Sequence, residues 1–155
     1  MGKGDLDRME ECFFIEQIAS DLRQDEGFSQ YPYLDTEGHL TVGYGRNLDA
    51  KGISNAEADM LLRNDIIASQ HALAQVLPVS SKLGKTRYRV LINMMFNLGI
   101  NGFMSFRKMR QAIFKQDFNR AADEMLDSKW AMQVGDRAIR LADMMRTGHD
   151  PRGRY

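Results

Sequence analysis

Three polar residues surround a short, turn-rich segment and belong to the residue types that acid and base catalysis uses. Glu26 lies at the end of an expected helix, Asp35 leaves one expected strand, and Thr41 enters the next. A carboxyl group that is partly withdrawn from water has a raised pKa and can donate a proton, whereas an ionised carboxylate can activate a water molecule. Glycoside hydrolysis needs one carboxyl group of each kind. The three residues are therefore candidates for that chemistry, with Thr41 helping to position the water.

The spacing also predicts how these residues meet. A hairpin turn centred on Gly38 would make Asp35 and Thr41 cross-strand partners, with their Cβ atoms about 4.5–5.5 Å apart, so that both could hold the same water. Glu26 is expected at the junction of helix and sheet. A mouth between the hairpin and a helical bundle would partly desolvate its carboxyl group there.

Three elements are expected to place this site. Apolar residues recur every three or four positions over residues 7–25, which is the pattern of an amphipathic helix. Residues 31–35 and 40–45, separated by turn-forming residues, predict a β-hairpin that a third short strand extends. A capping box at Ser54–Glu57 then opens a long helix that runs to about Pro78.

From residue 82 onward the chain has a helical period with breaks at Gly99, Gly102, around Gln116, at Gly135 and at Gly148. This pattern predicts about five short helices that pack as one bundle. Eight methionines fall in this segment and are expected to fill gaps in its core; they are Met94, Met95, Met104, Met109, Met125, Met132, Met144 and Met145.

The expected fold is α+β and mostly helical, with a small hairpin lobe joined by a long helix to a C-terminal helical bundle. We treat residues 1–155 as one domain. Its parts are a hairpin lobe with the candidate site over approximately residues 15–60, a connecting helix over 54–78, and a bundle over 79–155 on which the N-terminal helix packs.

Composition fits a globular protein, since 43% of the residues are hydrophobic and 27% are charged. The net charge of zero conceals an asymmetry. Residues 1–81 carry 6 Lys and Arg against 14 Asp and Glu, and residues 82–155 carry 15 against 7. A basic half can attract nucleic acid, membrane lipid or an acidic cell wall, and two lobes of opposite charge can equally attract each other.

Other residue types argue against metal, disulfide and membrane-spanning chemistry. Cys12 is the single cysteine, and His39, His71 and His149 are widely separated in sequence, so we expect no disulfide and no metal site. No apolar run reaches the roughly 18 residues that a membrane span needs, and the N-terminus is acidic where a secretory signal would be basic. We therefore expect synthesis in the cytoplasm and no stable membrane anchor.

The Glu-Asp-Thr spacing alone is weak, but longer motifs contain it. Asp25-Glu26-Gly27, Tyr33-Leu34-Asp35-Thr36-Glu37-Gly38 and Leu40-Thr41-Val42-Gly43-Tyr44-Gly45 together resemble the active-site hairpin of the T4-type phage lysozymes, glycoside hydrolase family 24. Residues 92–99 resemble the central bundle helix of that family. Ser128-Lys129-Trp130 with Gln133, Arg137 and Arg146-Thr147-Gly148 resembles its C-terminal segment. The resemblance covers about residues 15–148.

The resemblance implies a role for each residue of the hairpin. Glu26 would be the general acid, Asp35 the second catalytic carboxylate and Thr41 the hydroxyl that orients the water, with Arg137 close to Glu26. Members of this family hydrolyse the β-1,4 bond between N-acetylmuramic acid and N-acetylglucosamine with inversion, and no cofactor is implied. Further candidates for the substrate cleft are Leu34, Asn97 and Gln133.

The resemblance also implies a partner and a place of action. The partner would be the glycan strands of peptidoglycan, and nucleic acid is not expected as a partner because the second half shows no recognition motif. An endolysin of this kind would stay in the host cytoplasm as a monomer until a holin releases it to the periplasmic cell wall. Host cell lysis would follow.

Two features depart from the family pattern. Arg46 follows Gly45 where family members often carry His, and we expect this arginine to pair with Asp65 on the long helix. Some 14 residues precede the part of the first helix that resembles the family, and they could extend that helix, form a contact surface or act as a regulatory arm.

Two other functions compete with hydrolysis. A lytic transglycosylase uses a single carboxyl group and closes the muramic acid into an anhydro ring, and Asp35 and Thr41 argue against it. A cell-wall-binding module without catalysis would not need all three polar residues. Hydrolysis is therefore the function that the sequence favours.

Overall fold

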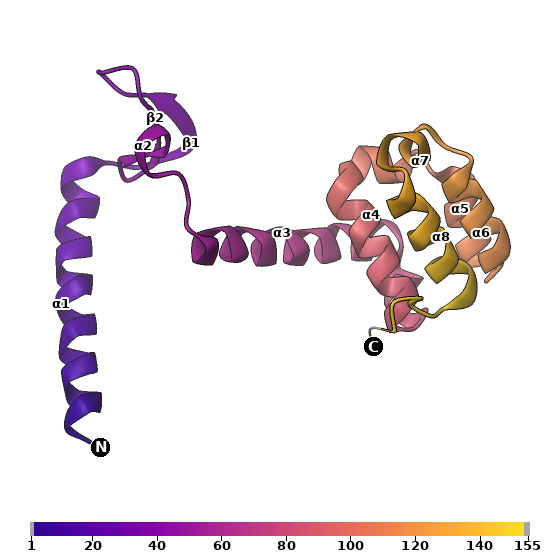
Figure 1. Cartoon of the computed structure of the whole chain (residues 1–155), viewed down its shortest axis with the longest axis horizontal. Coiled ribbons are helices and arrows are strands. Elements are labelled where there is room, and N and C mark those ends of the chain that lie inside the picture. The colour runs from indigo at the N-terminus through magenta and orange to yellow at the C-terminus, as the bar shows by residue number, and fades with distance from the viewer. Residues whose placement is uncertain (1, 154–155) are drawn as a thin grey trace. The chain divides into compact units, whose positions relative to one another are not determined.

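A computed structural model describes residues 2–153. The chain divides into two compact units, Met1–Ala58 and Asp59–Tyr155, and each is described here by itself. The division falls in the first turn of a long helix, α3 (Asn55–Val76), which is the connecting helix that the capping box predicts. The fold is α+β and mostly helical, as expected, with one small sheet and a bundle of short helices (Figure 1).

The first unit contains a long helix, a three-stranded sheet and a one-turn helix. Its elements are α1 (Lys3–Glu26), β1 (Ser29–Leu34), β2 (Leu40–Gly43), β3 (Arg46–Asn47) and α2 (Leu48–Lys51). The strands are antiparallel in the order β1-β2-β3, so the expected hairpin carries the expected third strand. None of the residues of α1 is buried, and large apolar side chains such as Phe13 are exposed along it. The packing of α1 on the bundle stays a prediction.

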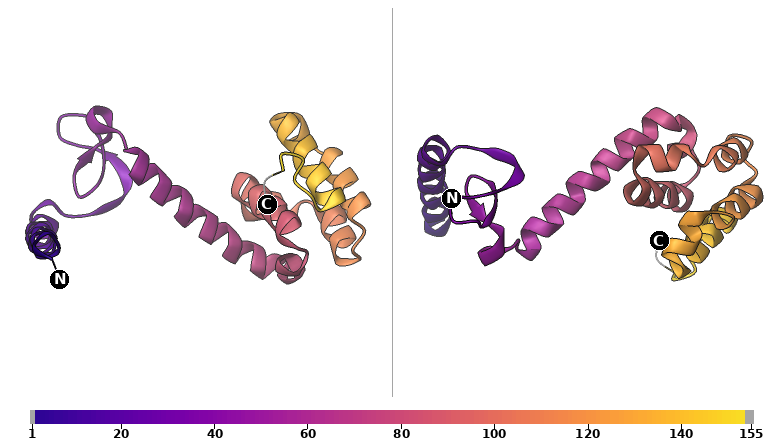
Figure 2. Two further views of the ribbon diagram at one scale, coloured as in Figure 1. Left: turned by 60° about the horizontal axis from the view of Figure 1, so that its bottom comes forward. Right: turned by 90° about the horizontal axis from the view of Figure 1, so that it is seen from above.

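The second unit is wholly helical. After α3 come η1 (Pro78–Lys82), α4 (Lys85–Met104), α5 (Arg107–Phe114), α6 (Phe118–Leu126), α7 (Lys129–Val134) and α8 (Asp136–Thr147). Helices α4 to α8 gather into one bundle, which both views of Figure 2 show from other sides. The expected breaks at Gly135 and Gly148 are confirmed as helix ends. Gly99 instead kinks α4 with a φ of 68°, and the helix continues through Gly102.

The core of the bundle is rich in methionine. Six of the eight methionines expected there are buried, namely Met94, Met95, Met109, Met125, Met144 and Met145. The expectation is wrong for Met104 at the end of α4 and for Met132 on α7, whose side chains are exposed. Both lie near helix ends, where the apolar period no longer determines which face meets the core.

The capping box at the start of α3 also holds the ion pair of Arg46. The Ser54 backbone N–H donates to Glu57 at 2.7 Å, and the Ser54 hydroxyl accepts from the Glu57 N–H at 3.1 Å, which confirms the capping box. The Arg46 guanidinium donates to both oxygens of Glu57, at 3.1 and 2.5 Å. The partner of Arg46 is therefore Glu57 and not the expected Asp65. The shorter chain path explains it, since β3 and the first turn of α3 belong to one unit.

None of the described helices is both long and apolar enough to cross a membrane.

The Arg46–Glu57 pair predicts a pH-dependent stability. The Arg46 guanidinium, helped by the Ser54 N–H, lowers the pKa of Glu57 from its ordinary value of 4.5 to about 2. A carboxylate with a depressed folded pKa stabilises the fold above its unfolded pKa, and this stabilisation is lost as the pH falls through the folded value. Thermal melts of wild type and Arg46→Met should therefore differ by a constant amount above about pH 5, and the difference should shrink between pH 4.5 and 2.

Arg63→Met is the matched control, because Arg63 is an exposed arginine on α3. Its effect on the melting temperature should not vary over the same window. An Arg46→Met effect that stayed constant down to pH 2 would contradict the role assigned to the pair.

Candidate active site

Glu26 is the last residue of α1 and lines a small hollow. The backbone turns directly after it, at Gly27, with a φ of 69°. The hollow has a volume of about 270 Å³ and is lined by Glu26, Gly27, Phe28, Ser29, Tyr33 and Gly43. Within this unit Glu26 is exposed, so the partial desolvation expected from the sequence is not found here.

Gly45 lets the backbone pass beside the carboxyl group of Glu26. It has a φ of 81°, a conformation that side chains disfavour, and a Cβ built on it would lie 3.5 Å from Glu26 Oε2. Next to it, the rings of Tyr44 and Phe28 pack at a centroid distance of 5.2 Å. The loop after β2 and the segment after α1 are thereby joined around Glu26.

Asp35 organises the turn between β1 and β2. Its Oδ1 accepts hydrogen bonds from the backbone N–H groups of Glu37, at 2.9 Å, and His39, at 2.8 Å. The hydrogen bond from the His39 N–H is the largest cause that lowers the pKa of Asp35 below its ordinary value of 3.8. Asp35 is therefore a carboxylate at neutral pH, and its second oxygen, Oδ2, is not used by the turn.

The pairing of the hairpin differs from the expected one by two residues, which moves the centre of the turn by one. Tyr33 pairs with Thr41 and Leu34 with Leu40, and the Asp35 N–H donates to the His39 carbonyl at 2.9 Å. The turn is thus centred on Glu37, because the Asp35 carboxylate closes it at His39. Asp35 and Thr41 are diagonal neighbours on one face of the sheet, about 7–8 Å apart at the backbone, and not direct cross-strand partners.

Thr41 lies in the middle of the sheet and is the most buried of the three residues, with 3% of its surface exposed. Its strand pairs on one side with β1 and on the other with β3, where Asn47 is its partner. The Thr41 hydroxyl donates to the His39 carbonyl at 3.1 Å. Its oxygen keeps lone pairs that can accept a hydrogen bond from water.

Sequence reasoning missed two residues that shape this site. The His39 ring places Nδ1 3.4 Å from Asp35 Oδ2 and 3.7 Å from Glu37 Oε2, and this buried nitrogen forms no hydrogen bond with the described residues. Asp49 accepts the N–H of Leu40 at 2.8 Å and so holds the start of β2. The position of His39 directly after the turn could have indicated that its ring lies near Asp35. Nothing in the sequence links Asp49 to Leu40.

The candidates for substrate binding divide between the units. Leu34 is exposed at the end of β1 in the first unit. Asn97 on α4 accepts a hydrogen bond from Trp130 Nε1 at 2.7 Å, and Gln133 on α7 lines a hollow of about 580 Å³ together with Trp130. Asn97 therefore holds the Trp130 ring by a hydrogen bond, and Gln133 shares a hollow with that ring.

Arg137, on α8, is held inside the second unit. It donates to Asn93 Oδ1 through Nε at 3.0 Å and through a terminal nitrogen at 2.7 Å. Both residues line a hollow of about 410 Å³. The approach of Arg137 to Glu26, implied by the resemblance, stays a prediction. Among the described residues, no group of three or more His, Cys, Asp or Glu could hold a metal ion.

Comparison with known proteins adds an independent finding. Residues 23–145 match the model of the family described as "Phage lysozyme". The chain is 26% identical to "Probable T4-type lysozyme 1" of Dictyostelium discoideum, over 86% of this chain and 96% of that protein. It is 28% identical to "Pre-baseplate central spike protein Gp5" of Enterobacteria phage T4, over 85% of this chain but only 28% of the spike protein.

The geometry of Asp35 predicts different effects for two substitutions. Asp35→Asn keeps an oxygen that can accept the N–H groups of Glu37 and His39, whereas Asp35→Ala removes it. Amide hydrogen exchange measured by NMR should show both N–H groups protected in wild type and in Asp35→Asn, and unprotected in Asp35→Ala. Equal protection in all three proteins would show that the side chain does not hold the turn.

Proposed function

Since this chain belongs to the phage lysozyme family, we propose that it hydrolyses the β-1,4 bond between N-acetylmuramic acid and N-acetylglucosamine, with inversion, to lyse a host cell. The family assignment makes the chain a glycoside hydrolase with peptidoglycan as its substrate. The choice of bond, the stereochemistry and the role in lysis are the proposed part.

The observation that carries the proposal is the unequal setting of two carboxyl groups in one unit. Two backbone N–H groups hold Asp35 in its ionised form. Glu26 lines the hollow and has no such donors among the described residues, so its carboxyl group is the one left to contact a bound glycan as the acid. Two carboxyl groups in unlike environments supply the acid and the base that glycoside hydrolysis requires.

In the proposed mechanism, Glu26 protonates the oxygen of the leaving sugar while the glycosidic bond breaks. Asp35 accepts a proton from a water molecule that attacks the opposite face of the anomeric carbon. Thr41 accepts a hydrogen bond from the same water and fixes its direction. The attack inverts the anomeric configuration because no covalent bond to the protein forms.

The proposal includes a route to the substrate. The protein would act as a monomer, stay in the host cytoplasm, and reach the periplasmic wall when a holin opens the inner membrane. Expression with and without a holin, followed by culture turbidity, tests this route.

Glu26→Gln tests the assignment of the acid. The amide cannot protonate the leaving oxygen, and general acid catalysis is worth about 100- to 10,000-fold, so the variant should lose at least 100-fold of its activity on purified peptidoglycan. Its melting temperature should stay close to that of wild type because the side chain is exposed.

Asp21→Asn is the control, since it removes one exposed acid from the same helix and should keep full activity. Glu26→Gln activity within tenfold of wild type would refute the assignment.

The role of Thr41 is tested by a pair of substitutions. Thr41→Ser keeps the hydroxyl group, whereas Thr41→Val keeps the shape and removes the hydroxyl. If the hydroxyl orients the water, kcat should fall by at least tenfold in Thr41→Val and by less than threefold in Thr41→Ser, while KM changes little. Equal kcat values for the two variants would remove this role.

Mass spectrometry of the digest separates hydrolysis from the transglycosylase reaction, because hydrated and anhydro ends differ by one water. NMR of the first products then assigns the anomer. Anhydro ends would refute hydrolysis, and products of retained configuration would refute inversion alone.

A further inference from the structure

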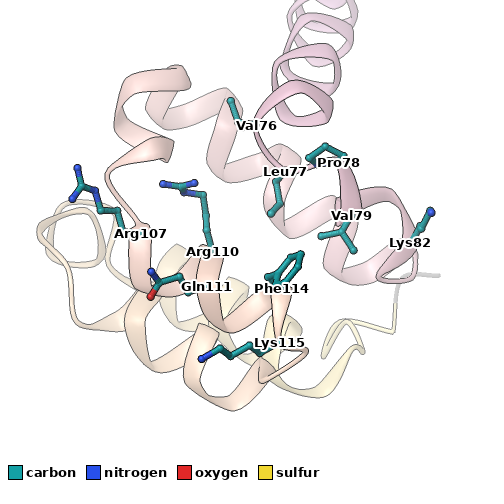
Figure 3. Close-up of a pocket in the computed structure, with 10 residues that line it drawn as sticks. All are labelled: Val76, Leu77, Pro78, Val79, Lys82, Arg107, Arg110, Gln111, Phe114 and Lys115. Atoms are coloured by element: carbon teal, nitrogen blue, oxygen red, sulfur yellow. The ribbon is translucent and has the colours of Figure 1, made fainter.

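The second unit carries a hollow of about 700 Å³ that is lined by none of the candidate catalytic or substrate-binding residues. One wall is the end of α3 with η1, where Leu77 and Val79 point into the opening. The other wall is α5, from which Phe114 turns toward them (Figure 3). The floor of the hollow is therefore apolar.

Four cationic side chains surround this floor: Lys82, Arg107, Arg110 and Lys115. No acid is among the ten residues that line the hollow, and none of the four cations forms an ion pair within residues 2–153. Lys82 and Arg107 point outward at the rim, whereas Arg110 lies across the opening (Figure 3). The positive charge around the hollow is thus free to meet an anion.

Arg110 has hydrogen-bonding capacity that the fold does not use. One terminal nitrogen donates to the Met104 carbonyl at 3.0 Å, which fixes the guanidinium, while its Nε is buried without a hydrogen-bond partner among the described residues. An unsatisfied buried donor is costly. An anionic group bound at the guanidinium would lower that cost after a small rotation.

Phe114 does not take part in the packing of the bundle core. The core side of α5 is filled by Met109, Ala112 and Ile113, which are buried, whereas 77% of Phe114 is exposed to solvent. An aromatic ring at the edge of an apolar hollow, with cations around it, is the arrangement found on surfaces that touch lipid headgroups. Long cationic side chains can reach the phosphates while the ring enters the apolar layer.

We propose that this hollow, bounded by Leu77, Val79, Arg110 and Phe114, is a reversible binding site for anionic phospholipid at a bilayer surface. A phosphate would lie at Arg110, and the rim cations would contact neighbouring headgroups. The glycan of the cell wall fits less well, because sugar hydroxyls need several hydrogen-bonding side chains and Gln111 is the single neutral polar residue in the lining. Nucleic acid would lack the stacked aromatic rings that usually hold single strands.

The site is independent of the proposed catalytic residues, since neither Glu26, Asp35 nor Thr41 lines it. It would keep the enzyme at the membrane face beside the wall without anchoring it. Loss of the site should therefore leave hydrolysis of soluble peptidoglycan fragments unchanged.

Vesicle cosedimentation of the full chain tests the proposal. Wild type should bind vesicles that contain phosphatidylglycerol and should not bind pure phosphatidylcholine. One cation near an anionic surface is worth about fivefold in affinity, so Arg107→Gln/Lys115→Gln should weaken binding about 25-fold. Phe114→Ser should weaken it at least about tenfold, because the ring no longer enters the apolar layer.

Matched control variants remove two positive charges, or one exposed apolar side chain, from surfaces outside the hollow. Lys51→Gln/Arg63→Gln takes two exposed cations from other elements, and Met132→Ser takes an exposed side chain of similar exposure from α7. Both should bind like wild type. Equal losses in the controls, or unchanged binding in the hollow variants, would overturn the site.

Two further results would also overturn it. Displacement from vesicles by millimolar glycerol phosphate would indicate a site for free phosphate, and a loss of binding to purified sacculi but not to vesicles would indicate a wall polymer as the ligand. Activity on soluble fragments is measured in parallel, so a failure of the lipid proposal stays distinct from a failure of the catalytic one.

Discussion

The candidate site depends on one carboxylate that closes a turn. Asp35 accepts hydrogen bonds from two backbone N–H groups of the residues that follow it. These hydrogen bonds decide where the chain reverses and which residues of β2 pair with those of β1. The same contact lowers the pKa of Asp35 and holds it as a carboxylate. Because one oxygen is occupied by the turn, the other is left for a different partner. One local interaction thus both folds the hairpin and sets the ionisation of the proposed catalytic base, so a change that disturbed one would disturb the other.

Glu26 is placed by quite different means. It ends a helix of 24 residues, and the positive φ values of Gly27 and Gly45 bring two loops to its carboxyl group without placing donors on it. A carboxylate tied into backbone hydrogen bonds and a carboxyl group left free at a hollow respond differently when a substrate excludes water. The first stays ionised because its hydrogen bonds remain, whereas the second has no backbone donor among the described residues. The proposed assignment of acid and base rests on this difference in hydrogen bonding and not on the residue types.

The sequence predicted the elements better than the contacts between them. The capping box, the strands and six of the eight methionines expected in the core followed from local chemistry that operates within a few residues, and these are confirmed. The centre of the turn was placed at Gly38, on symmetry and glycine content, whereas a side-chain acceptor moved it to Glu37. Arg46 was given Asp65 through a family resemblance, and it bonds to Glu57. In both cases a side-chain hydrogen bond outweighed a backbone or family pattern, and single-sequence periodicity carries no information on such bonds.

The excess of cations in the second half of the chain consists of two groups with different roles. Several of its arginines serve the fold: Arg89 and Arg152 pair with the buried Asp150, whose pKa they lower, and Arg87 donates to the carbonyls at the end of α8 while covering the ring of Phe118. These cations are neutralised or enclosed, so they add little to the field outside the protein. The cations around the hollow between η1 and α5 have no carboxylate partner among the described residues, and they surround an exposed aromatic ring. Unpaired positive charge therefore lies beside an exposed aromatic ring at this hollow. The fold does not require that combination, whereas contact with an amphipathic anion would.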